Sequence, residues 1–214
     1  MQHSGKLITI EGIEGVGKST QIAAVANYLR KQQISHITTR EPGGTPLAED
    51  IRNLILQPRA EPVAVNTELL LLFASRAQHL AQIILPALAR GDWVICDRFI
   101  DATYAYQGGG RKVPMPRIQE LAAWTLGNFK PDLTLLLDAP VELALARAKA
   151  RSNASDRFED EKTEFFTAVR AMYLECAKAE PKRIQVIAAE HALETVTQSI
   201  IQVLDTFLEN RDKV

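Results

Sequence analysis

Five short apolar runs alternate with longer stretches of helical periodicity along this chain, and no other feature limits its possible folds as strongly. The apolar runs cover residues 6–11, 35–40, 92–97, 132–138 and 183–188, and the helical stretches cover residues 18–32, 46–56, 67–90, 115–127, 140–150, 159–179 and 192–209. Strands that alternate with helices favour right-handed βαβ crossovers, and therefore a parallel sheet with helices on both faces. We predict a single α/β domain with a five-stranded parallel sheet, spanning residues 1–214.

The overall composition narrows the classes of function. Hydrophobic residues make up 46% of the chain, and the formal net charge of -1 argues against a general nucleic-acid binder. The first residues, MQHSGK, are polar, and no apolar run approaches the roughly 18 residues of a membrane span. Cys96 and Cys176 lie outside any CxxC pair, which predicts buried or partly buried thiols. We expect a cytoplasmic protein that contacts neither membrane nor nucleic acid.

A glycine-rich loop directly follows the first strand. GIEGVGKS matches the pattern G-x-x-x-x-G-K-[ST] in its required context, after a strand and before a helix. Its backbone N–H groups and the positive end of the helix can surround the phosphates of a nucleoside triphosphate, and a glycine-rich turn without a ligand is the structural alternative. The residues expected to hold this nucleotide are Gly12, Ile13, Glu14, Gly15, Val16, Gly17, Lys18, Ser19 and Thr20. Lys18 can reach the β- and γ-phosphates, and the Ser19 hydroxyl can bind Mg²⁺.

Two arginines follow the second strand. Ligands of parallel α/β sheets bind at the carboxyl ends of the strands, so TREPGGT (39–45) belongs to the same candidate site. Arg40 is either a solvated strand end or a cation directed into the cleft. Arg52, in the next helix, is either a surface residue or faces that cleft.

The third helical stretch places Phe73 and Arg76 three residues apart, on one helix face. A flat ring beside a guanidinium could hold a base. The segment by itself favours the simpler interpretation, in which Phe73 is core and Arg76 is solvated.

The segment CDRFIDATYAYQGGGR (96–111) is the richest in functional groups. Asp97 can orient a Mg²⁺ shell, and Arg98 can grip a phosphoryl group with two parallel hydrogen bonds. Thr103, Tyr106 and Gln107 offer a hydroxyl, an aromatic edge and an amide, which suit a sugar and a base with carbonyl and imide groups. A purely structural pair of Asp97 and Arg98 is the alternative.

A basic segment follows the fourth strand. ARAKARSNASDRFEDE (146–161) places Arg147, Lys149, Arg151 and Arg157 around a polar loop between two helices. Charge runs usually form a solvated face. Because this one follows a strand, it lies at the sheet edge that carries the glycine-rich loop, and we predict a lid over about residues 147–159 that closes on the transferred phosphoryl group.

Together these segments resemble the thymidylate kinase family. EGIEGVGKST, TREPGGTPLAEDIR, FASRAQHL, CDRFIDATYAYQGGGR, KPDLTLLLD and ARSNASDRFE occur in the order and spacing of that family, over nearly the whole chain. The resemblance implies a P-loop nucleoside monophosphate kinase-like fold, with ATP as phosphoryl donor and Mg²⁺. It implies phosphorylation of dTMP to dTDP by direct in-line transfer, a step of dTTP synthesis. It also implies a homodimer formed through helices, for which the apolar stretch 67–90 offers surface.

The resemblance gives each matched residue a role. Arg40, Arg52 and Arg98 would hold the dTMP phosphate, and Arg76 and Gln107 would recognise thymine. The remaining implied dTMP-binding residues are Glu41, Phe73, Thr103 and Tyr106, and the implied metal-binding residues are Ser19 and Asp97. Arg147 would contact ATP. The implied catalytic residues are Lys18, Arg98, Arg151, Arg157 and Glu14.

Four positions bear on how closely the chain follows the family pattern. Bacterial members lack the P-loop arginine of the eukaryotic kind, and Gly15 stands at that place here, so the lid would supply the catalytic cation through Arg151 or Arg157. Leu72 occupies the usual aromatic place beside the base, and Ala102 replaces a common serine. Glu14 would accept hydrogen bonds from dTMP or orient a cleft arginine, and a solvent-facing acid is the alternative.

Two rival functions remain open at this point. One is a kinase for another nucleoside monophosphate or for a deoxynucleoside, although three cleft arginines favour an acceptor that already carries a phosphate. The other is a nucleotide-dependent switch or motor module, which would need no acceptor site.

Overall fold

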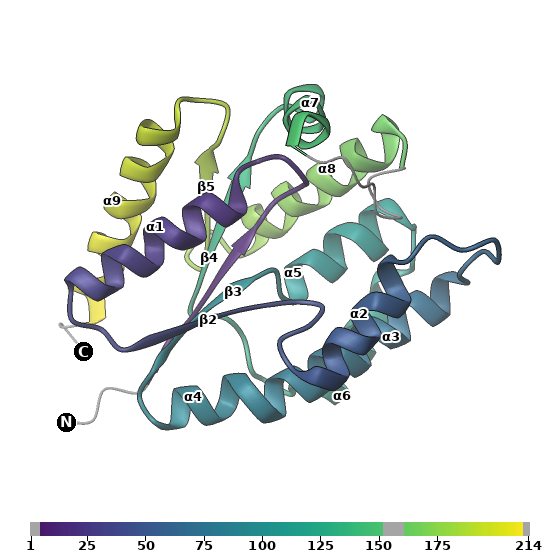
Figure 1. Ribbon diagram of the computed structural model, residues 1–214, viewed down its shortest axis with the longest axis horizontal. Helices are drawn as coiled ribbons and strands as arrows, with labels where there is room; N and C mark the ends of the chain where they lie inside the picture. Colours follow the sequence, from purple (N-terminus) through teal and green to yellow (C-terminus); the bar gives the residue numbers. More distant parts are fainter. Residues whose placement is uncertain (1–4, 152–160, 212–214) are drawn as a thin grey trace.

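A five-stranded, fully parallel sheet with the order β2-β3-β1-β4-β5 forms the centre of the molecule (Figure 1). The computed structural model describes residues 5–151 and 161–211. The strands are β1 Leu7–Glu11, β2 His36–Arg40, β3 Trp93–Asp97, β4 Leu133–Asp138 and β5 Ile184–Ala188. Each begins one residue after the predicted apolar run and ends with it, so the predicted parallel α/β fold is confirmed.

Helices cover both faces of this sheet. They are α1 Lys18–Lys31, α2 Pro46–Leu56, α3 Val65–His79, η1 Leu80–Ile84, α4 Leu85–Ala89, α5 Ile100–Thr103, η2 Tyr104–Gly110, α6 Met115–Leu126, α7 Val141–Arg151, α8 Thr163–Ala179 and α9 Leu193–Arg211. Figure 1 shows α1 and α9 on one side of the sheet, with α4, α5 and α8 on the other. The loops that follow the ends of the strands therefore lie between the helices of the two faces.

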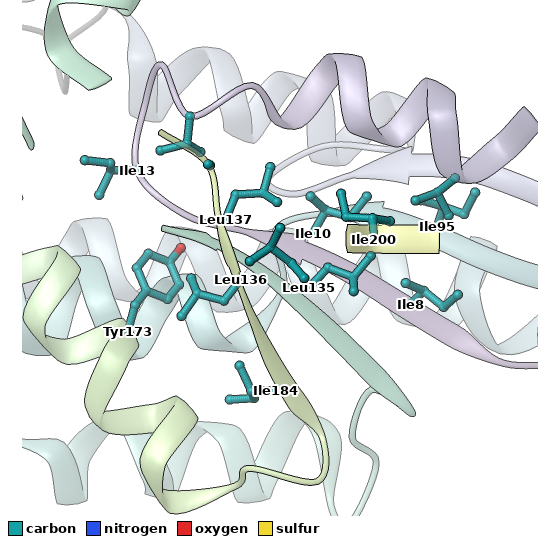
Figure 2. Packing of buried hydrophobic residues seen from close by; sticks show 14 of the residues in the cluster. Ile8, Ile10, Ile13, Ile95, Leu135, Leu136, Leu137, Tyr173, Ile184 and Ile200 are labelled. Carbon is teal, nitrogen blue, oxygen red and sulfur yellow. The ribbon is translucent and has the colours of Figure 1, made fainter. Parts of the chain in front are cut away.

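The core follows from the alternation of side chains along the strands. Ile8 and Ile10 of β1 point to the face covered by α1 and α9, where they pack with Leu135 and Ile200 (Figure 2). Leu7, one residue earlier, points to the opposite face and belongs to a second cluster with residues of α3 and η1. Since β1 is buried on both faces, its polar end at Glu11 is fixed firmly in place.

The helix predicted at 67–90 runs continuously from Val65 to Ala89, but residues 80–84 form a π-helical turn. Pro86 follows this turn and cannot donate the usual backbone hydrogen bond, which explains the local change in pitch. By length and composition this helix could cross a membrane, although core helices of soluble proteins pass the same test. Its buried side carries Glu68, Arg76 and His79.

The helical patterns of the sequence did not include residues 100–110, which form α5 and η2. Three consecutive glycines, 108–110, disfavour a helix by about 1 kcal/mol each relative to alanine. Packing against α8 overrides this cost. A Cβ atom on Gly109 would lie 2.7 Å from Cβ of Met172, so the close approach requires glycine.

Candidate active site

The glycine-rich loop connects β1 to α1 and lies directly under α7. Gly15 has a φ of +79°, and a Cβ atom there would lie 1.8 Å from the backbone oxygen of Ala144. No side chain fits at this position unless α7 moves. An arginine at position 15 is therefore excluded by the backbone of α7.

Lys18, the first residue of α1, folds back over this loop. Its Nζ donates to the backbone oxygens of Gly12 and Ile13, at 3.1 and 2.9 Å. Burial, helped by the positive charge of Arg98, lowers the pKa of Lys18 to about 8. A negatively charged ligand at this loop would therefore stabilise the ammonium form.

Arg98 joins the glycine-rich loop to the neighbouring cleft. Its backbone adopts a left-handed conformation with φ +67°. Nη1 donates to the Gly12 oxygen at 2.9 Å and to the Tyr173 hydroxyl at 3.1 Å, while Nη2 donates to Glu14 Oε1 at 2.8 Å and to the Tyr106 hydroxyl at 3.0 Å. These contacts fix the guanidinium beside the loop.

Glu14 is the acid that contacts this arginine. Both of its carboxylate oxygens also accept from the Tyr106 hydroxyl, at 2.8 and 2.7 Å. Burial works to raise the pKa of Glu14, but Arg98, Lys18 and Tyr106 together hold it below its usual value. The side chain is thus an ionised partner of Arg98 and not a solvent-facing acid.

A second buried acid, Glu11, binds two groups that adjoin Arg98. Its Oε1 accepts from the backbone N–H of Phe99 at 2.7 Å, and its Oε2 accepts from the Tyr173 hydroxyl at 2.7 Å. Burial first, and then the charge of Asp101, raise the pKa of Glu11 to about 8. The strand end therefore anchors both the backbone after Arg98 and the phenol that contacts its guanidinium.

A cleft opens beside Arg98, between α2, α3 and α5–η2. Its lining combines acidic and basic side chains with apolar ones. Its lining residues are Glu14, Glu41, Pro42, Arg52, Ile55, Leu56, Leu72, Arg76, Arg98, Phe99, Ala102, Thr103, Tyr106 and Gln107. The structure thus brings together most of the residues predicted for the acceptor nucleotide.

Arg76 is held at the far end of this cleft. Its Nε donates to Glu41 Oε2 at 2.7 Å, and its Nη2 donates to the Phe99 oxygen and to Thr103 Oγ1, both at 3.0 Å. Nη1 is buried and has no hydrogen-bond partner among the described residues. A buried donor without a partner is costly, so this atom is suited to an acceptor on a ligand.

Comparisons with known proteins agree with this geometry. A sequence profile described as thymidylate kinase matches residues 10–200. The chain is 55% identical to the thymidylate kinase of Pseudomonas entomophila, covering 96% of this chain and 98% of that one, and 54% identical to the enzyme of Pseudomonas syringae pv. tomato, with the same coverage. The chain belongs to the thymidylate kinase family. A crystal structure of thymidylate kinase from Ehrlichia chaffeensis matches with a TM-score of 0.75 at 33% identity, covering 94% of this chain and 99% of that one.

These matches confirm the predicted family, the P-loop kinase fold and the enzyme class, a phosphotransferase. The predicted roles of single residues are a separate matter, because they depend on where each side chain lies. Several residues predicted to bind dTMP line the cleft, among them Arg52, Arg76, Thr103, Tyr106 and Gln107.

Two residues lie elsewhere than their predicted roles suggest. Phe73 is buried in the second core cluster, with Arg76 stacked 5.2 Å from its ring centroid, and Leu72 lines the cleft instead. The predicted contact between Phe73 and thymine therefore finds no support in its placement, because the helix turns this ring toward the sheet. Arg40 is 53% exposed and pairs with Glu49 at 2.8 Å, outside the cleft lining.

The residues predicted to bind Mg²⁺ lie close to the glycine-rich loop. Oδ1 of Asp97, at the end of β3, is buried without a hydrogen-bond partner in the described part of the chain. Ser19 is exposed in the first turn of α1. Residues 5–151 and 161–211 contain no group of three acidic, histidine or cysteine side chains that could hold a metal alone.

The predicted lid lies mostly outside the described residues. Arg157 belongs to the part that is not described, and the same holds for the side chain of Arg151. Arg147 is described, and its Nη1 donates to the Ala189 oxygen at 2.7 Å. It therefore contacts the loop after β5.

Sequence reasoning missed three supporting residues: Glu11, Tyr173 and His79. Glu11 carried a weak signal, since it is an acid at the end of an apolar strand. Tyr173 lies on α8, and nothing in its local sequence indicates that it contacts a loop 75 residues away.

Proposed function

We propose that this chain transfers the γ-phosphoryl group of ATP to dTMP, forming dTDP, and that the loop and cleft described above are its donor and acceptor sites. The observation that carries this proposal is the position of Arg98. It contacts the glycine-rich loop through the Gly12 oxygen and also lines the cleft. One guanidinium thus connects the two sites between which a phosphoryl group would move.

On the donor side, the loop Gly12–Ser19 and Thr20 would surround the triphosphate of ATP, with Lys18 reaching its β- and γ-phosphates. Arg147 would contribute to the ATP site through the loop after β5. Arg151 and Arg157 are the proposed catalytic cations of the lid, since the close contact of Gly15 with α7 leaves no room for an arginine at position 15 of the loop.

Mg²⁺ is the proposed metal. Asp97 Oδ1 and the Ser19 hydroxyl are hard oxygen ligands of the kind that Mg²⁺ prefers, and a buried carboxylate oxygen without a partner fits this role. Mg²⁺ commonly uses one or two protein ligands together with substrate phosphates, which agrees with the lack of a larger ligand group in the described chain. When bound, the ion would neutralise charge on the transferred group.

On the acceptor side, Arg98, Arg52 and Arg40 would hold the dTMP phosphate. Arg40 would have to exchange its pairing with Glu49 for the phosphate, which its exposure permits. Arg76 Nη1 would donate to the thymine carbonyl at C4. Because Gln107 Nε2 donates to Glu68 at 2.8 Å, its amide oxygen would be left to accept from the imide N–H.

The reaction needs positioning and charge stabilisation rather than a general base. An oxygen of the dTMP phosphate forms the new bond to the γ-phosphorus, and the bond from that phosphorus to the β–γ bridging oxygen breaks, releasing ADP. The nucleophile is an anionic oxygen, so no proton has to be removed. Lys18, Arg98 and the lid arginines would stabilise the negative charge on the phosphoryl group during its transfer.

A coupled ADP-release assay with ATP and Mg²⁺ tests this function. We expect turnover with dTMP, weaker turnover with dUMP, and little with UMP, CMP, dGMP or AMP. Lys18→Ala should abolish turnover with all of them. ADP release that did not depend on the acceptor would overturn the assignment of the cleft while leaving the nucleotide loop intact.

We also propose a homodimer that forms in the cytoplasm without membrane or nucleic-acid partners. The outer face of the long helix Val65–Ala89 supports this proposal, because one line of exposed positions along it is apolar: Leu70, Ala74, Ala77, Ala81 and Leu85. The exposed polar residues Asn66, Thr67 and Gln82 are not part of this line. A continuous apolar stripe on a helix is a suitable contact for an identical copy.

A further inference from the structure

A buried chain of hydrogen bonds runs beneath the acceptor cleft, from Thr39 at the end of β2 to Arg76 on α3. His79 lies at its centre, with Nε2 2.7 Å from Thr39 Oγ1 and Nδ1 3.1 Å from Glu41 Oε1. Glu41 Oε2 then accepts from Arg76 Nε at 2.7 Å. The side chain of His79 is 0% exposed and that of Glu41 is 3% exposed, so water does not compete for these contacts.

The chemistry of the partners fixes the hydrogen atoms on His79. An ionised carboxylate only accepts, so Nδ1 of His79 must carry the hydrogen that it shares with Glu41. In the neutral ring, Nε2 then accepts from the hydroxyl of Thr39. His79 thereby occupies Oε1 of Glu41 and leaves Oε2 for Arg76.

Because each carboxylate oxygen of Glu41 binds a different partner, Glu41 determines where Arg76 points. A guanidinium is planar, so fixing Nε through Glu41 and Nη2 through Phe99 and Thr103 also fixes the direction of Nη1. Nη1 is the atom that lacks a partner among the described residues. Its direction decides whether it meets an acceptor on the base.

Without His79, Glu41 would be free to use both oxygens on Arg76. The Asp138–Arg170 pair in this protein shows that geometry, with Nε and Nη2 of the arginine donating to the two carboxylate oxygens at 2.7 and 2.9 Å. The same arrangement at Arg76 would draw Nη2 away from Phe99 and Thr103. The guanidinium would turn, and Nη1 would turn with it.

We propose that His79 is a specificity-determining positioning residue, which acts through Glu41 to direct Nη1 of Arg76 at the C4 substituent of a pyrimidine. A carbonyl at C4 accepts from this N–H, whereas an amino group at C4 presents a donor to it and leaves the buried donor unpaired. His79 thus sets the preference for thymine over cytosine without contacting either base. This inference rests on the proposed function, in which Arg76 contacts the base.

The test compares kcat/KM for dTMP with kcat/KM for dCMP, and where dCMP turnover is too slow, its inhibition constant replaces the second value. In His79→Gln the amide reaches the place of Nε2 and the contact with Glu41 is lost, so we expect the dTMP-to-dCMP ratio to fall about tenfold, chiefly through KM for dTMP. In His79→Asn the amide nitrogen stands near the place of Nδ1 and can still donate to Glu41. This matched variant should keep the ratio within about threefold of the parent, a small change on the scale of binding energies.

Further variants keep the inference falsifiable. If His79→Gln fails to fold, Glu41→Gln tests the next link, because only one of its two terminal atoms accepts and either His79 or Arg76 loses its acceptor; an unchanged ratio in that variant would also overturn the proposal. A normal ratio in a folded His79→Gln with a lowered Tm would show a purely structural histidine and overturn the proposal. Arg76→Lys should lower the ratio by itself, and if it does not, the proposed reading of the base by Arg76 is wrong, which separates that failure from a failure of His79.

Discussion

Glu14 places a negative charge in a loop that is suited to bind anions, and its pairing with Arg98 explains this charge. Its carboxylate binds Arg98 at 2.8 Å and accepts from Tyr106, so the acid keeps the cleft arginine in place beside the loop. The hydrogen bond from Arg98 is charge-assisted and mostly shielded from solvent, which makes it stronger than a surface pair. The acid therefore acts on the acceptor side of the loop.

The first prediction concerns this acid. Replacing Glu14 by alanine removes the carboxylate that accepts from both Arg98 and the Tyr106 hydroxyl, at a cost of about 1–3 kcal/mol. We expect KM for dTMP to rise tenfold or more while KM for ATP changes little, as measured by steady-state kinetics. Unchanged kcat and KM for dTMP in Glu14→Ala would contradict this role.

Lys18 leads to a prediction about pH. Its pKa of about 8 means that the neutral amine predominates above that pH, while the triphosphate favours the charged form and raises the pKa in the complex. Affinity for an ATP analogue that resists hydrolysis should therefore be constant below pH 8 and fall up to about tenfold per unit above it. Calorimetry at pH 8.5 in buffers of different ionisation heat should show proton uptake on binding.

A matched variant completes the pH experiment. Lys18→Met carries no titrating group, so its affinity should be weak and should not change between pH 7 and 9. A parent protein with constant affinity over that range would show that the pKa of Lys18 is not lowered.

At the scale of elements, the contact between η2 and α8 controls the cleft. The glycines of η2 let α8 approach closely, and α8 carries Tyr173, whose hydroxyl contacts both Arg98 and Glu11. Tyr106 of η2 packs edge-on against Tyr173, with ring centroids 6.3 Å apart. A shift between these helices would therefore reach the arginine of the acceptor site.

Gly109→Ala tests this coupling. The added methyl group would overlap with Met172 and with the backbone oxygen of Ala168, so unfolding free energy should fall by about 1–3 kcal/mol and kcat/KM for dTMP should fall as well. Urea unfolding and steady-state kinetics measure the two effects.

Gly127→Ala is the control for that experiment. Gly127 ends α6 with φ +56°, and a Cβ atom there would meet no described atom within 4 Å. We expect a loss of about 1 kcal/mol from backbone strain, with normal kinetics. Equal kinetic losses in both variants would show that stability alone explains the effect of Gly109→Ala.

At the scale of the whole molecule, the long helix Val65–Ala89 serves two surfaces. Its inner side carries Arg76 and His79 to the acceptor cleft, and its outer side presents the apolar stripe proposed for the dimer. Dimer formation would thus brace the same helix that carries the base-reading arginine.

The last prediction tests this interface. Leu70→Glu places a charge on the stripe, and burying it without a partner is unfavourable, so a dimer of the parent protein should dissociate to monomers in sedimentation experiments. Leu193→Glu on α9 is the matched control, because Leu70 is 55% exposed and Leu193 is 50% exposed. The interface would be misplaced if Leu193→Glu dissociated the dimer and Leu70→Glu did not.

The sequence by itself determined the strands, most helices and the glycine-rich loop. These features depend on neighbours within a few residues, since apolar runs and helical periodicity report local burial. The rule that ligands bind at the carboxyl ends of parallel strands placed Arg98 and Gln107 at the site, and the resemblance to the thymidylate kinase family added Arg52 and Arg76. Those four residues line one cleft in the structure.

Only the tertiary structure decided the strand order, the helix at residues 100–110 and the partners of the buried charges. Gly109 lies in a helix because α8 packs against it, which local propensity cannot show. Leu72 faces the cleft and Phe73 the core because of how α3 is rotated on the sheet, a difference of one residue that periodicity does not resolve. The hydrogen bonds between Tyr173 and Glu11 and between His79 and Glu41 join residues 162 and 38 positions apart, and such pairings follow from the packed fold as a whole.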